Sequence, residues 1–215
     1  MDMSRQASDL LLKIKAIHLN IKDPYTLTSG TISPVYIDCR KLISYPCERS
    51  LMMDLAVSKI KYEVGSDKFD LVAGGETAGI PYAAWVSERL SLPMIYVRKK
   101  PKEFGRGKQI EGEMKKGDRV LLVEDLIFNS QSKEGFIEGI RDAEGVVNHV
   151  IVIFEYGLTE ARENLRRIGV ELHSLTCWQT TISRGEETGY FTHEEADEIR
   201  MFLADPAQWY KQLQI

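Results

Sequence analysis

Short apolar runs alternate with helix-like stretches over most of the chain, and no other feature limits the possible folds as strongly. The runs occupy residues 69–75, 94–99, 119–125, 149–156 and 170–177. Near-continuous apolar strands that are joined by helices are typical of a parallel sheet whose two faces are both covered. We therefore expect an α/β fold with a mostly parallel sheet flanked by helices.

The two ends of the chain follow other patterns. Apolar residues at helical spacing predict an amphipathic helix over residues 4–19. Turn signals within residues 24–42 predict a short hairpin, and residues 47–63 predict a second helix. Two helices should close the chain. The second should begin at Thr192, because Thr192 and Glu195 have the spacing of a capping box.

Composition narrows the possible classes of function. The 215 residues are 43% hydrophobic and 28% charged, as in a globular protein without broad disorder. A formal net charge of −4 argues against a general nucleic-acid surface, and no apolar run reaches membrane-spanning length. The three cysteines, Cys39, Cys47 and Cys177, fit neither a disulfide framework nor a zinc site. We expect a cytoplasmic protein that binds neither nucleic acid nor membranes.

The first candidate site is the segment AGGETAG at residues 73–79. Ligands of open α/β sheets bind beyond the carboxyl ends of the strands. Gly74 and Gly75 are expected to form a tight turn, and the following helix offers free N–H groups to an anion. Glu76 stands where a dinucleotide fingerprint needs glycine, which argues against a dehydrogenase. The alternative is an ordinary turn between a strand and a helix.

The second candidate is a basic loop at residues 98–112. Its cations are Arg98, Lys99, Lys100, Lys102, Arg106 and Lys108. An acidic protein that concentrates positive charge in this way can receive a polyanion. Gly105 and Gly107 would permit the motion of a lid. The alternative is a solvated surface loop.

The third candidate is the pair Glu124 and Asp125 at the end of an expected strand. Adjacent carboxylates repel each other, and ligand hydroxyls or a metal ion carried by the ligand would give them a reason to be there. The alternative is a solvated pair. The polar loop that follows, residues 128–132, stands where a phosphate cradle would stand, yet it contains no glycine.

The four histidines are scattered through the chain. They are His18, His149, His173 and His193. None stands at the spacing of a metal site or a catalytic triad, so we interpret them as surface or packing residues.

Taken together, these segments resemble the type I phosphoribosyltransferases, and among them the orotate phosphoribosyltransferase family. TSGTISPVYIDCRKL resembles the amino-terminal segment of the family, and VAGGETAGIPYAA resembles its pyrophosphate loop. VRKKPKEFGRGKQIEG resembles its flexible catalytic loop, and VLLVEDLIFNSQS resembles its PRPP signature. The order and spacing of all four segments match, and the resemblance covers most of the chain.

The resemblance implies one domain over residues 1–215, with a hood formed by about residues 1–45 and the C-terminal helices. It implies that orotate and 5-phosphoribosyl-1-pyrophosphate (PRPP) give orotidine 5′-monophosphate and pyrophosphate. Mg²⁺ would be carried mainly by PRPP, with no metal site on the protein. The resemblance also implies a homodimer in which the loop of one subunit covers the site of the other.

The resemblance further implies roles for individual residues. The catalytic residues would be Lys102, Glu124 and Asp125, the two carboxylates holding the ribose hydroxyls. Arg98 and Lys99 would join Lys102 in neutralising pyrophosphate. The other substrate-binding residues would be Ser29, Tyr36, Gly74, Gly75, Glu76, Thr77, Ile127, Phe128, Asn129, Ser130, Gln131 and Ser132. The amides between Ile127 and Ser132 would bind the 5-phosphate.

The signature loop departs from the family pattern, because only Ser132 fits it. Either the backbone reaches the phosphate without glycine, or the loop bends away and the site is poor. We expect a weakened site that glycine at both Ser130 and Gln131 would improve. Glu155 lies near the position of an orotate-contacting arginine in some relatives. Two rival functions stay open: a binding or regulatory protein without turnover, and a phosphoribosyltransferase for another base.

Overall fold

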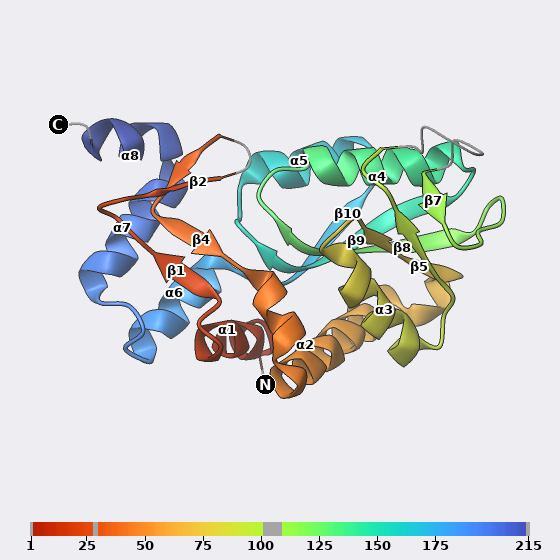
Figure 1. The fold of residues 1–215 in the computed structure, drawn as a ribbon, viewed down its shortest axis with the longest axis horizontal. Helices are drawn as coiled ribbons and strands as arrows, with labels where there is room; N and C mark the ends of the chain where they lie inside the picture. Colours follow the sequence, from red (N-terminus) through yellow and green to blue (C-terminus); the bar gives the residue numbers. More distant parts are fainter. Residues whose placement is uncertain (1, 28–29, 101–108, 214–215) are drawn as a thin grey trace.

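A six-stranded sheet forms the centre of the molecule (Figure 1). The computed structural model describes residues 2–27, 30–100 and 109–213. The strand order is β10-β9-β8-β5-β6-β7, and every pairing is parallel except that of β6 with β7. The strands are β5 (Leu71–Gly75), β6 (Met94–Val97), β7 (Ile110–Glu111), β8 (Arg119–Ile127), β9 (Val146–Glu155) and β10 (Glu171–Cys177). The expected fold class is confirmed, and only the short β7 was not predicted.

Helices cover both faces of this sheet (Figure 1). One face carries α1 (Met3–Lys13), α2 (Pro46–Lys59) and α3 (Gly79–Leu90), and the other carries α4 (Gln131–Asp142) and α5 (Thr159–Arg167). Alternation along β8 divides its side chains between two cores. Leu121 and Val123 belong to the core of the first face, and Val120 and Leu122 to the core of the second.

The amino-terminal helix is shorter than predicted. Helix α1 ends at Lys13, and Ile17–Leu19 forms strand β1. Lys15 adopts a positive φ of 53°, a conformation that ends the helix and turns the chain. Residues 17–19 then pair antiparallel with β4 (Val35–Ile37). The helical spacing of Ile17 was misleading because Ile17 is equally buried as part of a strand.

The predicted hairpin and capping box are both present. Strand β2 (Tyr25–Thr26) pairs antiparallel with β3 (Ile32–Ser33). Thr192 Oγ1 accepts a hydrogen bond from the Glu195 amide at 3.2 Å, and Glu195 Oε2 accepts one from the Thr192 amide at 2.9 Å. This box starts α7 (His193–Ala204), which follows α6 (Trp178–Glu187).

Within the described residues up to 213, three helices follow β10, where two were expected. Helix α8 (Pro206–Leu213) is separated from α7 by Asp205, whose backbone is extended. Proline at position 206 disfavours helical geometry in the preceding residue and suits the first position of a new helix. Helices α6 to α8 lie beside β1 to β4 at one end of the molecule (Figure 1). No helix in the described ranges combines the length and the apolar character that crossing a membrane requires.

Candidate active site

Three of the predicted segments meet at the carboxyl edge of the sheet. Strands β8, β5 and β6 are neighbours, and Gly74 pairs in register with both Val123 and Tyr96. The chain leaves β5 at Glu76 and β6 at Arg98, and these residues lie in one region with Asp125 of β8. Strand β8 continues to Ile127, so the strand end expected at residue 125 was placed two residues too early, because pairing with β9 extends to Ile127. This is the edge at which ligands of open α/β sheets bind.

The glycines of the first segment serve close packing rather than a turn. Gly74 and Gly75 lie inside strand β5, so the predicted tight turn at these residues was wrong. A Cβ on Gly74 would lie 2.9 Å from the Cβ of Ala83 in α3. A Cβ on Gly75 or Gly79 would lie 2.4 or 2.2 Å from Glu124 Oε1. The missing side chains make room for helix α3 and for the carboxylate of Glu124. The Glu76–Thr77 peptide bond that follows is cis.

Glu124 is a buried carboxylate with a buried cationic partner. Its side chain is 6% exposed, and Oε2 lies 3.0 Å from Nζ of Lys133 in α4, which is 8% exposed. Oε1 has no hydrogen-bond partner among the described residues. Burial raises the pKa of Glu124 to about 7, although the positive charge of Lys133 opposes the rise. Glu124 is thus not the solvated carboxylate of the alternative interpretation.

Asp125 lies on the other side of strand β8. Successive side chains of a strand point to opposite faces, so the two carboxylates that are adjacent in sequence are directed apart. Asp125 is half-buried, and its Oδ1 accepts a hydrogen bond from the Leu126 amide at 2.8 Å. Burial raises its pKa, while the charges of Lys133 and Arg40 lower it. Asp125 therefore faces the amino-terminal segments.

Tyr36 and Arg40 come to this region from the amino-terminal part. Tyr36 lies on β4, and Arg40 lies on the 3₁₀ helix η1 (Cys39–Ser44) that follows. Arg40 Nη2 donates a hydrogen bond to the Tyr36 hydroxyl at 2.7 Å. Burial lowers the pKa of Arg40, but Tyr36, Asp38 and, to a smaller extent, Asp125 raise it above the ordinary value. Arg40 was missed in the sequence, where its one signal is a charge three residues after a strand.

The base of the basic loop is closed by hydrogen bonds. The Arg98 amide donates to the Gln109 carbonyl at 2.9 Å, and Gln109 Nε2 donates to the Arg98 carbonyl at 2.8 Å. The Lys99 amide donates to Glu76 Oε2 at 2.9 Å, which joins this loop to the first segment. Arg98 also forms an ion pair with Glu111 at 3.7 Å. Lys102 and Ser29 lie outside the described residues.

The glycine-free loop leads into α4 without any left-handed residue. In the described chain, the non-glycine residues with positive φ are Lys15, Ser91 and Glu144, all outside this loop. Ser130 has φ −86° and is buried, and its Oγ accepts a hydrogen bond from Asn164 Nδ2 at 3.2 Å.

Two side chains anchor the flanks of this loop. Lys133 Nζ donates to Ser132 Oγ at 3.2 Å, so Lys133 links the loop to Glu124. The ring of Phe128 packs edge-on against Tyr156, with centroids 5.0 Å apart. The buried Lys133 was missed in the sequence. Its signal was a cation in the first turn of a helix, where the helix dipole disfavours positive charge unless a partner is present.

Glu155 is committed to a structural ion pair. Its Oε1 and Oε2 accept hydrogen bonds from Nε and Nη2 of Arg162 at 2.6 and 2.5 Å, and Ser174 Oγ donates to Oε2 at 2.8 Å. The Glu155 side chain is 5% exposed. A carboxylate held in this way ties β9 to α5 and β10, and its oxygens are engaged within the protein.

Comparisons with known proteins agree on one family. An orotate phosphoribosyltransferase of Rhizobium meliloti (strain 1021) is 49% identical over 208 residues, which are 96% of this chain and 90% of the relative. The solved orotate phosphoribosyltransferase from Aeropyrum pernix is 30% identical with a TM-score of 0.70, over 85% of this chain and 99% of that one. The structure of Leishmania donovani UMP synthase matches with 28% identity and a TM-score of 0.81, over 94% of this chain but 42% of that longer chain. No family model matches the sequence.

Proposed function

The chain belongs to the orotate phosphoribosyltransferase family, and on that premise we propose that it transfers the 5-phosphoribosyl group of PRPP to orotate. The products are orotidine 5′-monophosphate and pyrophosphate. The observation that carries the proposal is the meeting of three segments at one sheet edge: Glu76–Thr77 after β5, Arg98–Lys99 after β6, and Asp125, two residues before the end of β8. Each of these segments carries charged or hydrogen-bonding groups that suit the ribose or the pyrophosphate of PRPP.

The chemistry calls for positioning and charge rather than for a covalent nucleophile. When the bond between the anomeric carbon and pyrophosphate breaks, positive charge develops on the ribose ring and negative charge on the leaving group. Asp125 is the more exposed of the two carboxylates, and its role in the proposal is to accept hydrogen bonds from the ribose hydroxyls. Glu124, held by Lys133 behind it, completes the carboxylate pair and positions the strand end.

Pyrophosphate is assigned to the two neighbouring segments. The Glu76–Thr77 turn and the start of α3 offer backbone N–H groups, and Lys99 offers a positive charge beside them. Lys102 is assigned to the same anion, from a loop whose base is closed by Arg98 and Gln109. Mg²⁺ enters with PRPP as part of the substrate and supplies further neutralisation of the leaving group. Closure of the loop excludes water, which would otherwise hydrolyse PRPP.

The 5-phosphate is assigned to the amino terminus of α4. The first N–H groups of a helix have no partner within the helix, and they point outward at a site where the helix dipole favours negative charge. Helix α4 begins at Gln131, directly after the polar residues Asn129 and Ser130. Ser132 offers a hydroxyl in the same turn.

The proposed function is tested by an assay of PRPP-dependent orotate consumption beside a panel of other purine and pyrimidine bases. Orotate should be the base consumed, and Asp125→Asn should lower kcat/KM by roughly 10- to 100-fold, because charge-assisted hydrogen bonds to the ribose are lost. Asp142→Asn, an exposed carboxylate at the end of α4, serves as the matched control and should leave the rate unchanged. Turnover of another base instead of orotate, or normal kinetics in a folded Asp125→Asn protein, would contradict the assignment.

We also infer a homodimer with shared sites. Large exposed apolar side chains gather on η1, α2 and the π-helical turn η2 (Ile60–Val64), namely Ile43, Tyr45, Leu51 and Tyr62. Leu51 lies on α2, and Tyr62 lies on the π-helical turn that continues it. An apolar strip of this kind is typical of a surface that packs against another chain. In the proposed dimer, the basic loop of one subunit reaches the carboxylates of the other.

A further inference from the structure

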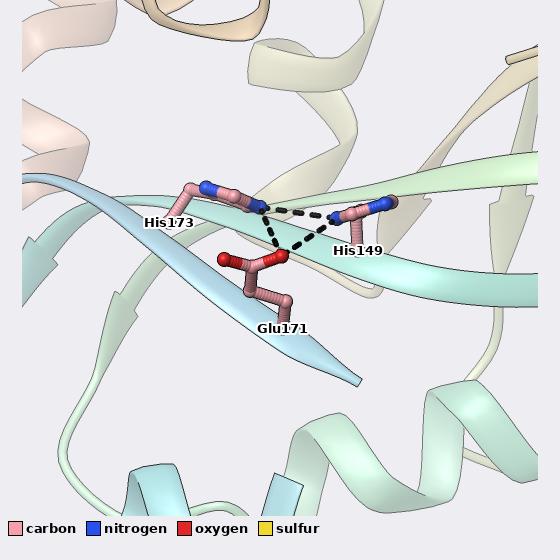
Figure 2. Close-up of side chains that lie close together, drawn as sticks. All are labelled: His149, Glu171 and His173. Carbon is pink, nitrogen blue, oxygen red and sulfur yellow. Dashed lines mark hydrogen bonds and ion pairs between the residues drawn. The ribbon is translucent and has the colours of Figure 1, made fainter. Parts of the chain in front are cut away.

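Two histidines and a glutamate converge on one face of the β9–β10 pair (Figure 2). Glu171 of β10 pairs in register with His149 of β9. His173 lies two residues after Glu171 and therefore points to the same face of the sheet. His149 is six residues before Glu155 at the carboxyl end of β9, or about 20 Å along the strand. The cluster thus belongs to the opposite edge of the sheet.

The three side chains present their ligand atoms to one point. His149 Nδ1 and His173 Nε2 are 3.1 Å apart, and Glu171 Oε2 lies 3.7 Å from the first and 3.9 Å from the second. In a tetrahedral zinc site with bonds of about 2.0–2.1 Å, neighbouring ligand atoms are about 3.3 Å apart. The observed triangle differs from that geometry by a few tenths of an ångström on each side. Figure 2 shows the three groups turned toward one another.

The surroundings suit a metal ligand set. His173 Nδ1 lies 3.7 Å from Oε2 of Glu63, and Lys59 holds the other oxygen, Oε1, at 2.7 Å. The Glu63 carboxylate is beyond hydrogen-bond range of Nδ1, but its negative charge lies behind the second nitrogen of the imidazole, where the outer partner of a ligating histidine is found. His149 is packed edge-on against Phe69, with ring centroids 5.6 Å apart.

The ligand set is open to solvent on the side of Glu171. Glu171 is 67% exposed, so an ion can enter from solvent. A surface hollow of about 430 Å³, lined in part by His149 and Glu171, opens beside it.

A hydrogen bond between the two imidazoles would account for the 3.1 Å contact alone. It would not account for Glu171, whose oxygen lies beyond hydrogen-bond range of both nitrogens while facing the point between them. Two imidazole nitrogens and a carboxylate oxygen within 3.9 Å of one another form the ligand set that suits a cation of borderline softness.

We propose that His149, Glu171 and His173 bind one Zn²⁺ or a similar divalent transition metal ion, with water as the fourth ligand and Glu63 behind His173. Zinc has no redox chemistry of its own, and the site lies away from the reacting groups. Its effect is to fasten the edge strand β10 to β9 and, through Glu63, to η2.

The test uses the full chain freed of metal by chelation and dialysis. Zn²⁺ binding is measured by calorimetry, and Co²⁺ binding by the visible absorption of a tetrahedral ion. The variants are Glu171→Gln, whose exposed side chain leaves the fold intact, His173→Gln and the outer Glu63→Gln. The matched controls are Glu163→Gln on α5 and His193→Gln on α7, while Cys47→Ser removes the exposed thiol.

One ion per chain is expected, with affinity reduced at least tenfold in Glu171→Gln and His173→Gln, and by roughly 10- to 100-fold in Glu63→Gln. Saturating Zn²⁺ should raise the Tm of the wild-type chain by roughly 5 °C and leave that of Glu171→Gln nearly unchanged. The controls should bind as the wild type does. Absence of binding, or equal binding by the wild type and Glu171→Gln, overturns the proposal, as does binding that only Cys47→Ser removes. If His173→Gln does not fold, the comparison with Glu171→Gln decides.

Discussion

Glu124 combines a buried charge, a single cationic partner and two glycines that leave it room. Its Oε1 lies where Gly75 and Gly79 have no side chain, and its Oε2 is held by Lys133. The carboxyl protonates more readily in the folded chain than in the unfolded chain, because burial disfavours its charged form. Its contribution to stability is therefore complete below about pH 4.5 and is lost as the pH rises through about 7.

Glu124→Gln should remove this dependence of stability on pH. A pKa of about 7 against an ordinary value of 4.5 corresponds to a loss of roughly 2.5 kcal/mol in the wild-type chain between about pH 5 and 8, which the variant lacks. Urea unfolding of both chains across this pH range measures the difference. Any pH-independent difference in stability between the two chains leaves the slopes unchanged, so the comparison rests on the slopes. Parallel slopes would show that Glu124 titrates normally.

The conformation of the polar loop between β8 and α4 shows whether a phosphate-binding loop at this position needs glycine. No residue of this loop has positive φ, and Ser130 has helical dihedral angles. A glycine is required where the backbone is left-handed or where a side chain would collide, and Ser130 meets neither condition. Its side chain is buried against α5 through Asn164. The conformation thus favours the first of the two alternatives drawn from the sequence, in which the backbone reaches the phosphate unaided.

The double variant Ser130→Gly with Gln131→Gly should bind Mg²⁺-PRPP no more tightly than the wild type, contrary to the expectation from sequence alone. Ser130→Gly should also cost about 1–2 kcal/mol of stability, since a buried hydrogen bond is lost and the unfolded chain gains freedom. Calorimetric titration gives the affinity, and denaturant unfolding gives the stability. Gln131→Gly alone, at an exposed position, is the control for stability. Tenfold tighter binding by the double variant would mean that the loop is strained after all.

In the proposed dimer, residues of both subunits form each active site, so two inactive variants should restore activity when they form a hybrid dimer. Lys102→Ala and Asp125→Asn should each be nearly inactive alone, because each removes one part of every site. After exchange of subunits in an equal mixture, half of the dimers are hybrids, and each hybrid has one site with both residues intact. Roughly a quarter of the wild-type number of sites should recover, as measured by orotate consumption.

A substitution in the exposed apolar strip of Ile43, Tyr45, Leu51 and Tyr62 is the control for this experiment. Leu51→Glu places a charge on the proposed interface and should yield monomers by light scattering, with no recovery on mixing. Met201→Glu, at an exposed apolar position on α7, is the matched substitution and should change neither result. Failure to recover despite confirmed exchange would show that each site is built within one chain.

The sheet, most of its helices and the location of the candidate site could be predicted from the sequence alone. Apolar runs and helical periodicity are local properties of the sequence, and they predict where the strands end. Because ligands bind at the carboxyl ends of the strands, these predicted ends also give the location of the site. The segments after β5, β6 and β8 were found in this way. The capping box at Thr192 was found as well, because both of its partners lie within four residues.

Contacts between residues distant in sequence could not be predicted, because they depend on how the strands are ordered and paired. Strand β1 replaced the end of a predicted helix because Ile17 pairs with Ile37. The reason for Gly79 is the carboxylate of Glu124, and neither residue reveals it alone. His149 and His173 show no metal spacing, yet the parallel register of β9 and β10 brings their nitrogens within 3.1 Å. Sequence periodicity determines the face of the sheet to which a side chain points, whereas strand order and register determine which residues it contacts there.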